Sequence, residues 1–222
     1  MFWEPVHNAD AFRRAGHREV LPAGREMDAG RYVALVESGI CGLTTVTPEG
    51  NERTYLYFKP GDLVGFLRHV LHQDKFPRAH FYRTRNRVVA KSRVELTLID
   101  KDAFLDLTRR HAGCHQDFTI SLAQNLANLM EHSALVSCES APIRICAMLL
   151  EFCEPEGERS VLPACFTQGE ISAFLALHKI TVAKVLGSLT EAGYIRRTGR
   201  RLEVVEPARL TQVVERQLCI RY

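Results

Sequence analysis

The sequence predicts an α+β protein with a β-rich first part and a mostly helical second part. Three observations carry this prediction. Short runs of β-branched and aromatic residues, separated by Gly, Pro and Asp turns, fill the first part of the chain. A long stretch without Gly or Pro then repeats its apolar residues in heptads. Two short helical patterns and a pair of short β patterns come last.

The 222-residue chain has room for one large domain or two smaller ones, and its 46% hydrophobic and 25% charged residues are typical of a globular protein. The longest apolar run, Ile145–Leu150, has six residues, whereas a membrane-spanning helix needs about 20. The first residues lack the basic start and apolar core of a signal peptide. We therefore expect a cytoplasmic protein with no membrane partner.

The cysteines predict reduced thiols. The chain has seven of them, an odd number, and no C-x-x-C pair. A secreted disulfide framework and the usual zinc and iron–sulfur spacings are therefore not expected.

The β-rich part predicts an antiparallel sandwich or barrel within residues 1–112. Its runs are bounded by the turns Thr47–Asn51 and Lys59–Asp62, whose Gly, Pro and Asp residues are typical of tight turns. The strands expected from this pattern are Arg31–Val36, Ile40–Val46, Arg53–Phe58, Val88–Ala90 and Val94–Ile99.

A long helix is predicted within residues 113–140, because apolar or small residues recur there in steps of three and four. The helix either packs on its own domain or forms a two-stranded coiled coil with a second copy. We favour the second reading, a homodimer contact, because the apolar stripe is narrow. The residues expected at that interface are Leu122, Leu126, Leu129, Ser133 and Val136.

A third part is expected over residues 141–222. Pro142 fits the start of a helix over Ile143–Cys153. The polar, turn-rich segment Glu154–Arg159 then has the composition of a linker, and we expect a hinge near it.

The segment after Phe166 predicts a helix-turn-helix. Thr167 and Glu170 have the spacing of a capping box at the start of a short helix. A turn at Leu177–Lys179 separates it from a second helix whose outer face is basic. The residues expected to face the core are Ile171, Phe174, Leu175, Val182, Val185, Leu186 and Leu189.

A β-hairpin is predicted next, with Thr198-Gly199 at its turn and four arginines near its tip. Such a wing can reach phosphates beside the groove that the second helix enters. From Ser160 to Tyr222 the chain carries nine Lys/Arg against five Asp/Glu, whereas the preceding part carries 20 against 21. We therefore expect double-stranded DNA as the partner, contacted by Thr167, Gln168, His178, Lys179, Ile180, Thr181, Lys184, Arg197 and Arg200.

The chain resembles the cyclic-AMP receptor protein / fumarate-nitrate-reduction regulator (CRP/FNR) superfamily over nearly its whole length. The motifs that carry the resemblance are Arg31–Gly39, Gly50-Asn51-Glu52, Pro60-Gly61-Asp62 with Gly65, Arg144, Thr167 with Glu170, Thr181-Val182 and Gly193-Tyr194-Ile195. The resemblance implies a cyclic-nucleotide-binding-like β-roll, a dimerisation helix and a winged helix-turn-helix. It implies a homodimer on a palindromic operator with half-sites about 34 Å apart, allosteric control by a small-molecule effector, and RNA polymerase as a further partner.

Three positions of the helix-turn-helix depart from the family pattern. Ala176 replaces the usual turn glycine, so we expect a less left-handed backbone there. Ile180 replaces a base-reading Glu; it cannot accept a hydrogen bond from cytosine but can contact a thymine methyl. Lys184 replaces an arginine and lacks its planar fork. The operator should therefore differ from the commonest one.

The effector is not expected to be cyclic AMP. Gly65 is followed by Phe66 instead of the ribose-binding Glu that the family's cyclic-AMP binders carry. The cysteine cluster of the iron–sulfur members is also missing, because the first cysteine is Cys41.

Four interpretations of the sensor region remain. Residues 66–87 are a solvated basic loop, or they hold an anionic effector through Arg78 and Arg83, with Asn128 and His132 of the long helix lining the pocket. They could instead bind haem through His69 and His72, because imidazole is a good iron ligand. A thiol redox sensor near the hinge, at Cys138, Cys146 and Cys153, is a further alternative.

We expect the protein not to be an enzyme. The rival reading is a cupin-like metal enzyme built on the histidines of the roll. Asp74 is the only acidic residue near His69 and His72 in the sequence, which is a poor ligand set for a catalytic metal.

Overall fold

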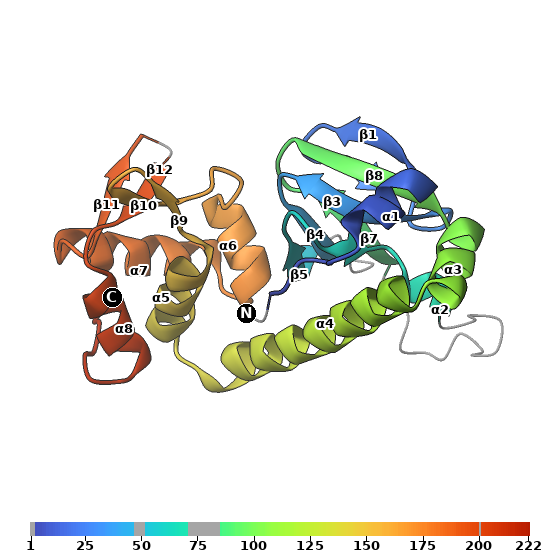
Figure 1. Ribbon diagram of the computed structural model, residues 1–222. Coiled ribbons are helices and arrows are strands. Elements are labelled where there is room, and N and C mark those ends of the chain that lie inside the picture. Colours follow the sequence, from blue (N-terminus) through green and yellow to red (C-terminus); the bar gives the residue numbers. More distant parts are fainter. Residues whose placement is uncertain (1–2, 47–51, 71–84, 200) are drawn as a thin grey trace. The chain divides into compact units, whose positions relative to one another are not determined.

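The computed structural model describes residues 3–46, 52–70, 85–199 and 201–222. Contacts divide it into two units that meet within one helix, α4 (Ala112–Cys138): the residues up to Met130, and Glu131–Tyr222 (Figure 1). The α+β class is confirmed. Whether the long helix counts as a separate part of the chain, over 113–140, stays a prediction.

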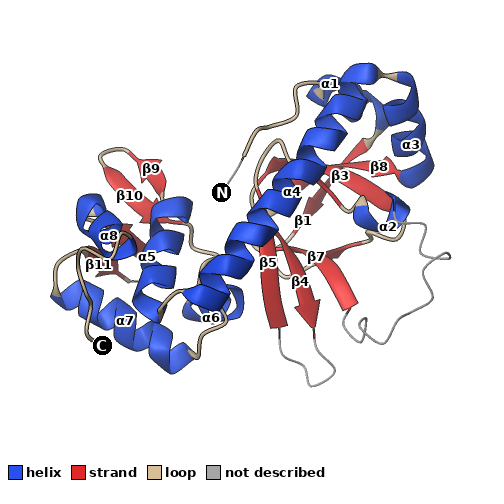
Figure 2. Ribbon diagram, turned by 90° about the horizontal axis from the view of Figure 1, so that it is seen from below, coloured by secondary structure: helices blue, strands red, loops and turns tan. Residues whose placement is uncertain are grey.

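The first unit is a β-roll of two four-stranded antiparallel sheets. Its strands are β1 (His17–Leu21), β2 (Glu26–Met27), β3 (Tyr32–Ser38), β4 (Cys41–Val46), β5 (Glu52–Phe58), β6 (Leu63–Val64), β7 (Arg85–Ala90) and β8 (Val94–Asp100). One sheet has the order β1-β8-β3-β6 and the other β2-β7-β4-β5. Figure 2 labels β1, β8 and β3 of the first sheet and β7, β4 and β5 of the second. The five predicted strands correspond to β3, β4, β5, β7 and β8. The turns at Gly50-Asn51 lie outside the described residues.

Two apolar layers hold the roll together. Ala34, Val36 and Leu96 of the first sheet pack against Leu56 and Val88 of the second, so the sheets share one core. The other face of the first sheet is covered by helices α1 (Ala9–Ala15) and α3 (Lys101–Arg110) and by the start of α4. A short helix, α2 (Leu67–Val70), follows β6.

A buried carboxylate fixes the N-terminal segment to α4. Asp117 accepts hydrogen bonds from the backbone N–H groups of His7 at 3.0 Å and Asn8 at 2.8 Å, and from the Asn8 amide at 3.0 Å. These donors lower the pKa of Asp117 despite its burial. The first turns of α4 are therefore part of the roll.

The second unit is a small sheet covered by helices. It contains α5 (Ala141–Phe152), β9 (Glu154–Glu156), β10 (Arg159–Leu162), α6 (Gln168–Leu175), α7 (Lys179–Glu191), β11 (Ile195–Thr198), β12 (Arg201–Val204) and α8 (Pro207–Val214). The strand order is β11-β12-β10-β9.

The prediction of a linker at Glu154–Arg159 is wrong. This segment is a β-hairpin, in which Glu156 pairs with Arg159 and Glu154 with Val161. Gly157 provides the positive φ of 63° that the tight turn requires. The side chains of β9 are exposed, which explains why the segment has the polar composition of a linker.

Within the described residues, no single helix is long and apolar enough to cross a membrane, although α6 and α7, bent by 111°, reach that length and composition as a pair.

Candidate nucleic-acid interface

The first helix of the predicted helix-turn-helix begins as expected. Thr167 is the N-cap of α6, and its hydroxyl accepts the backbone N–H of Glu170 at 3.2 Å. Ile171, Phe174 and Leu175 are buried, as predicted. The helix axis then turns by 111° into α7, which is typical of this motif.

The backbone expectation for Ala176 is wrong. Ala176 has φ 53° and ψ 43°, a left-handed conformation. The turn geometry therefore persists without its glycine, at the cost of the strain that a Cβ carries in this region. The turn is reinforced by Ser172, whose hydroxyl donates to the Leu177 carbonyl at 2.5 Å.

The second helix, α7, has one buried and one exposed face. The buried face is the predicted one: Val182, Val185, Leu186 and Leu189. On the other face His178, Lys179, Ile180 and Lys184 are exposed, and Thr181 is half-buried. Ile180 is 73% exposed, so its apolar side chain stands in the solvent between the two lysines of this face.

The starts of α6 and α7 lie close together. A Cβ built on Gly169 would lie 3.6 Å from Thr167 Oγ1 and 3.9 Å from Lys179 Nζ. The structure thus gathers Thr167 and Lys179 around the first turn of α6. Gln168 is half-buried in the same turn.

The wing is formed by β11 and β12, with Gly199 at φ 61° in its turn. Arg197 is exposed and forms no ion pair with any described residue. Arg200 lies outside the described residues. The wing therefore presents at least one cation without an acidic partner among the described residues, on the same unit as α7.

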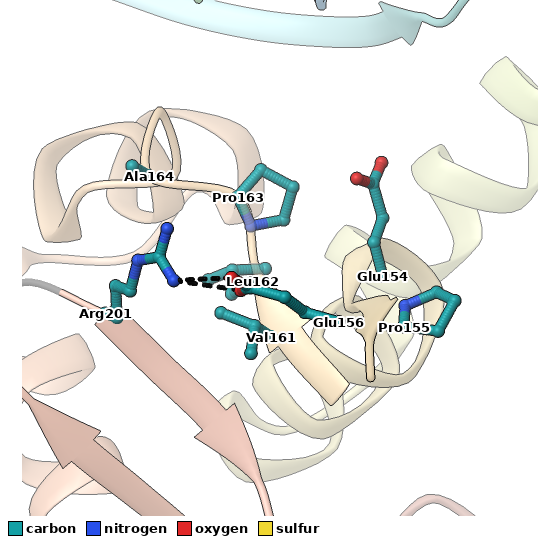
Figure 3. Close-up of a pocket in the computed structure, with 8 residues that line it drawn as sticks. All are labelled: Glu154, Pro155, Glu156, Val161, Leu162, Pro163, Ala164 and Arg201. Atoms are coloured by element: carbon teal, nitrogen blue, oxygen red, sulfur yellow. Dashed lines mark hydrogen bonds and ion pairs between the residues drawn. The ribbon is translucent and has the colours of Figure 1, made fainter. Parts of the chain in front are cut away.

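Two wing arginines are engaged by acidic side chains, which the sequence did not reveal. Arg196 lies 3.8 Å from Glu203 on the neighbouring strand. Nη1 of Arg201 lies 2.9 Å from both carboxylate oxygens of Glu156 on β9, beside a pocket of about 210 Å³ (Figure 3). Figure 3 shows Glu154 pointing away from this pair. These contacts tie β11 to β12, and the tip of the wing to the neighbouring hairpin β9–β10.

The predicted interface stripe on α4 is largely uncovered in the single chain. Leu126 is 61% exposed and Leu129 is 40% exposed, and Ser133 is exposed as well. Leu122 packs partly on the core of the roll, and Val136 is half-buried. Met130, 65% exposed, extends the apolar face, and the heptad pattern had not singled it out.

The candidate sensor residues are not brought together in the described part of the chain. His72, Arg78 and Arg83 lie outside the described residues. Asn128 is buried on α4, and His69 is half-buried on α2. His132 belongs to the second unit, where its ring stacks on Phe174 of α6 with 4.3 Å between centroids. No three His, Cys, Asp or Glu side chains gather as a metal site among the described residues.

The interior thiols are poor redox groups. Burial raises the pKa of Cys41, Cys146 and Cys153 to about 12. The thiolate is the reactive form of cysteine, so this burial disfavours a redox sensor at Cys146 and Cys153, whereas Cys138 is exposed.

Two sequence families match the chain. Residues 143–213 match the Crp-like helix-turn-helix domain, and residues 25–111 match the cyclic nucleotide-binding domain. The first covers α5 to α8 and the second covers most of the roll.

Individual relatives align over most of the chain. The cyclic AMP receptor protein of Thermus thermophilus is 27% identical over 202 residues, 88% of this chain and 87% of the relative. The fumarate and nitrate reduction regulatory protein of Vibrio cholerae is 22% identical over 200 residues, 88% of this chain and 75% of the relative. The structure of FixK2 from Bradyrhizobium japonicum superposes with a TM-score of 0.73 at 18% identity, covering 89% of this chain and 96% of FixK2.

Proposed function

The chain belongs to the CRP/FNR family of transcription regulators, and from this premise we propose that it acts as a homodimer that reads a palindromic DNA site under the control of a small-molecule effector other than cyclic AMP. It combines a DNA-binding helix-turn-helix with an effector-binding domain of the cyclic-nucleotide-binding type. As a regulator, it has RNA polymerase as a further partner in this proposal.

The observation that carries the DNA-binding site is the outward face of α7. Ile180 and the exposed cations Lys179 and Lys184 stand on one face, opposite the four buried residues that fix the helix to its core. A helix presented in this way fits the major groove, where side chains reach base edges. Arg197 of the wing, with Arg200, would contact phosphates on either side.

The test begins with selection of a duplex from a randomised DNA pool by the wild-type protein. We expect enrichment of a two-fold-symmetric sequence. Lys184→Ala should then weaken binding to the selected duplex by about 1–3 kcal/mol for each half-site, the cost of one base contact in each subunit. Arg209→Ala is the matched control, since Arg209 is an exposed cation on α8 outside the proposed interface. Equal affinity of Lys184→Ala and wild type would contradict the assignment.

The dimer proposal rests on the uncovered apolar face of α4. Leu126, Leu129 and Met130 expose large apolar side chains side by side along this helix. Contiguous exposed apolar side chains of this kind mark interaction surfaces. A second copy of α4 would bury them as a two-stranded coiled coil.

The exclusion of cyclic AMP is supported by the packing of Phe66. This side chain is buried in the core of the roll, and its ring meets Phe118 of α4 edge-on at 5.3 Å. It replaces a carboxylate that would have to face a ribose. Cyclic AMP should therefore leave the affinity for the selected duplex unchanged, which a titration in its presence would measure.

A haem-based sensor is the alternative within the same family. It would use His69 and His72 as ligands, and the purified protein would then show a Soret absorption band. A stoichiometric non-haem metal would instead favour the second alternative, a cupin-like metal enzyme. Our proposal, an anionic organic effector held with the help of Arg78 and Arg83, expects neither result.

A further inference from the structure

The C-terminal end of α6 is held by side chains from two other helices. The last carbonyl groups of a helix have no partner within it and need one from elsewhere. In α6 these include the carbonyls of Phe174 and Leu175, which immediately precede the left-handed turn at Ala176. Both receive side-chain hydrogen bonds from outside the helix-turn-helix.

His132 of α4 supplies the first bond. Its imidazole donates to the Phe174 carbonyl, while its ring stacks on the Phe174 ring at an interplanar angle of 22°. Nδ1 of His132 is buried without a hydrogen-bond partner, so Nε2 is the donor. One residue of α4 thus contacts both the backbone and the side chain of Phe174.

Arg144 of α5 supplies the second bond. Its Nη1 donates to the Leu175 carbonyl at 3.2 Å, and its Nε donates to the Glu139 carbonyl at 2.7 Å. Glu139 directly follows the last residue of α4. A single guanidinium therefore connects the C-terminal ends of α4 and α6, where a cation also interacts favourably with the helix dipoles.

Glu139 is fixed from a second direction. Its carboxylate lies 2.8 Å from Nη2 of Arg216, which follows α8. The junction between α4 and α5 is thus tied to α6 by Arg144 and to the C-terminal segment by Arg216. The planar guanidinium of Arg144 suits this task, since lysine cannot donate to two carbonyls in fixed directions.

We infer that His132 and Arg144 are positioning residues for sequence-specific DNA recognition: they fix the end of α6, and through the turn at Ala176 the orientation of α7, to the C-terminal end of α4. This inference rests on the proposed DNA-binding function. In this inference His132 connects α4 to the helix-turn-helix and does not line the effector pocket.

The mechanism predicts a loss of specificity with little loss of non-specific affinity. Non-specific binding depends on cations near phosphates, and neither residue is placed among them. Base reading depends on the orientation of α7. A loosened α6 end should therefore weaken binding to the duplex selected by the wild type much more than binding to a scrambled duplex.

The experiment compares paired substitutions at both positions. His132→Phe keeps an aromatic ring on Phe174 but removes the donor, whereas His132→Gln keeps an amide donor. Arg144→Met removes both bonds, and Arg209→Met removes an exposed charge on α8 as the control. Affinity for the selected and the scrambled duplex is measured at one salt concentration, with the thermal midpoint of each variant.

We expect His132→Phe and Arg144→Met each to lower the selected-to-scrambled affinity ratio roughly tenfold, because each removes one strong hydrogen bond to the end of α6. His132→Gln and Arg209→Met should keep the wild-type ratio within about twofold. An unchanged ratio in His132→Phe and Arg144→Met would overturn the inference. So would a loss in both duplexes that follows only the drop in thermal midpoint, because that would make the residues merely structural. A wild-type protein that selects no duplex would overturn the proposed function itself.

Discussion

At the scale of single residues, Ala176 shows how a fold can keep a turn without its preferred amino acid. Its φ of 53° lies in the region that costs a residue with a Cβ about 1–2 kcal/mol. Helix α6 on one side and α7 on the other are both packed by buried apolar residues, and this packing imposes the turn. The sequence could show that glycine was missing, but not that the neighbouring helices would enforce the geometry.

Replacing Ala176 by glycine should therefore stabilise the second unit. Relief of the left-handed strain outweighs the greater conformational freedom of glycine in the unfolded chain, about 0.4–1 kcal/mol. We expect Ala176→Gly to raise the free energy of unfolding by about 0.5–1 kcal/mol, measured by urea denaturation. A control is Ala183→Gly, in the middle of α7, which should destabilise by a similar amount. A loss of stability in Ala176→Gly would contradict this account of the turn.

Substitution of Arg197 should have a different effect from substitution of Lys184, because Arg197 is expected to contact phosphates and Lys184 a base. A phosphate contact is independent of sequence, so Arg197→Ala should weaken selected and scrambled duplexes alike. The slope of log K against log salt should become shallower by about 1 for each subunit, and so by about 2 for the dimer. Arg201→Ala offers a contrast, since Arg201 already pairs with Glu156 at 2.9 Å. A change confined to the selected duplex would show that Arg197 reads bases.

His132 should make the stability of the protein depend on pH. Burial lowers its pKa below the usual 6.5, partly offset by the bond to Phe174. Below pH 6.5 the unfolded chain therefore binds more protons at this residue than the folded one. Its contribution to stability is complete above about pH 6.5 and is lost as pH falls toward the lower folded pKa.

The measurement is the difference in unfolding free energy between wild type and His132→Gln at pH 8 and at pH 5. The difference isolates His132 from other groups, such as Asp62, whose pKa burial raises to about 6 and which acts in the opposite direction. We expect the wild type to lose more stability than the variant on acidification. An identical loss would show that His132 titrates normally.

At the scale of elements, the strands and helices with a strong periodic pattern were predictable, and the short or exposed ones were not. The N-cap residue Thr167 predicted the start of α6. The helical spacing of Val182, Val185 and Leu189 predicted α7. In contrast, β1 is an edge strand with mostly exposed side chains, so it shows no alternation of polar and apolar residues. The hairpin β9–β10 was not predicted for the same reason: the side chains of β9 are exposed, and together with the turn glycine they give the segment the composition of a linker.

The candidate site was predictable where it depends on one helix and unpredictable where it depends on packing between elements. The outer face of α7 follows from the helical period alone. The pairing of Arg201 with Glu156, 45 residues apart, and the stacking of His132 on Phe174 join elements that are distant in the chain. No local pattern encodes such contacts.

The exposed apolar face of helix α4 can be tested by adding a charge to it. In a coiled coil of two α4 helices, Leu126→Glu would place two like charges against each other. We expect the dimer to dissociate, which sedimentation velocity would detect as a shift to the monomer mass. Gln116→Glu, at an exposed position in the first turns of α4, adds the same charge away from the stripe and should leave the dimer intact. A variant that stays dimeric would place the interface elsewhere.

At the scale of the whole molecule, a dimer bound to DNA requires a fixed distance between the two half-sites of the operator. Two α7 helices related by a two-fold axis reach successive major grooves on one face of the duplex, about 34 Å or one helical turn apart. Inserting five base pairs at the centre of the selected duplex rotates one half-site by about half a turn. Since only one subunit can then read its bases, affinity should fall roughly a hundredfold, toward non-specific binding.

The same insertion outside the site is the control and should have no effect. If the centrally expanded duplex binds as tightly as the original in a titration at equal salt, each subunit reads DNA alone, and the α4 contact would then serve a purpose other than recognition of a palindrome.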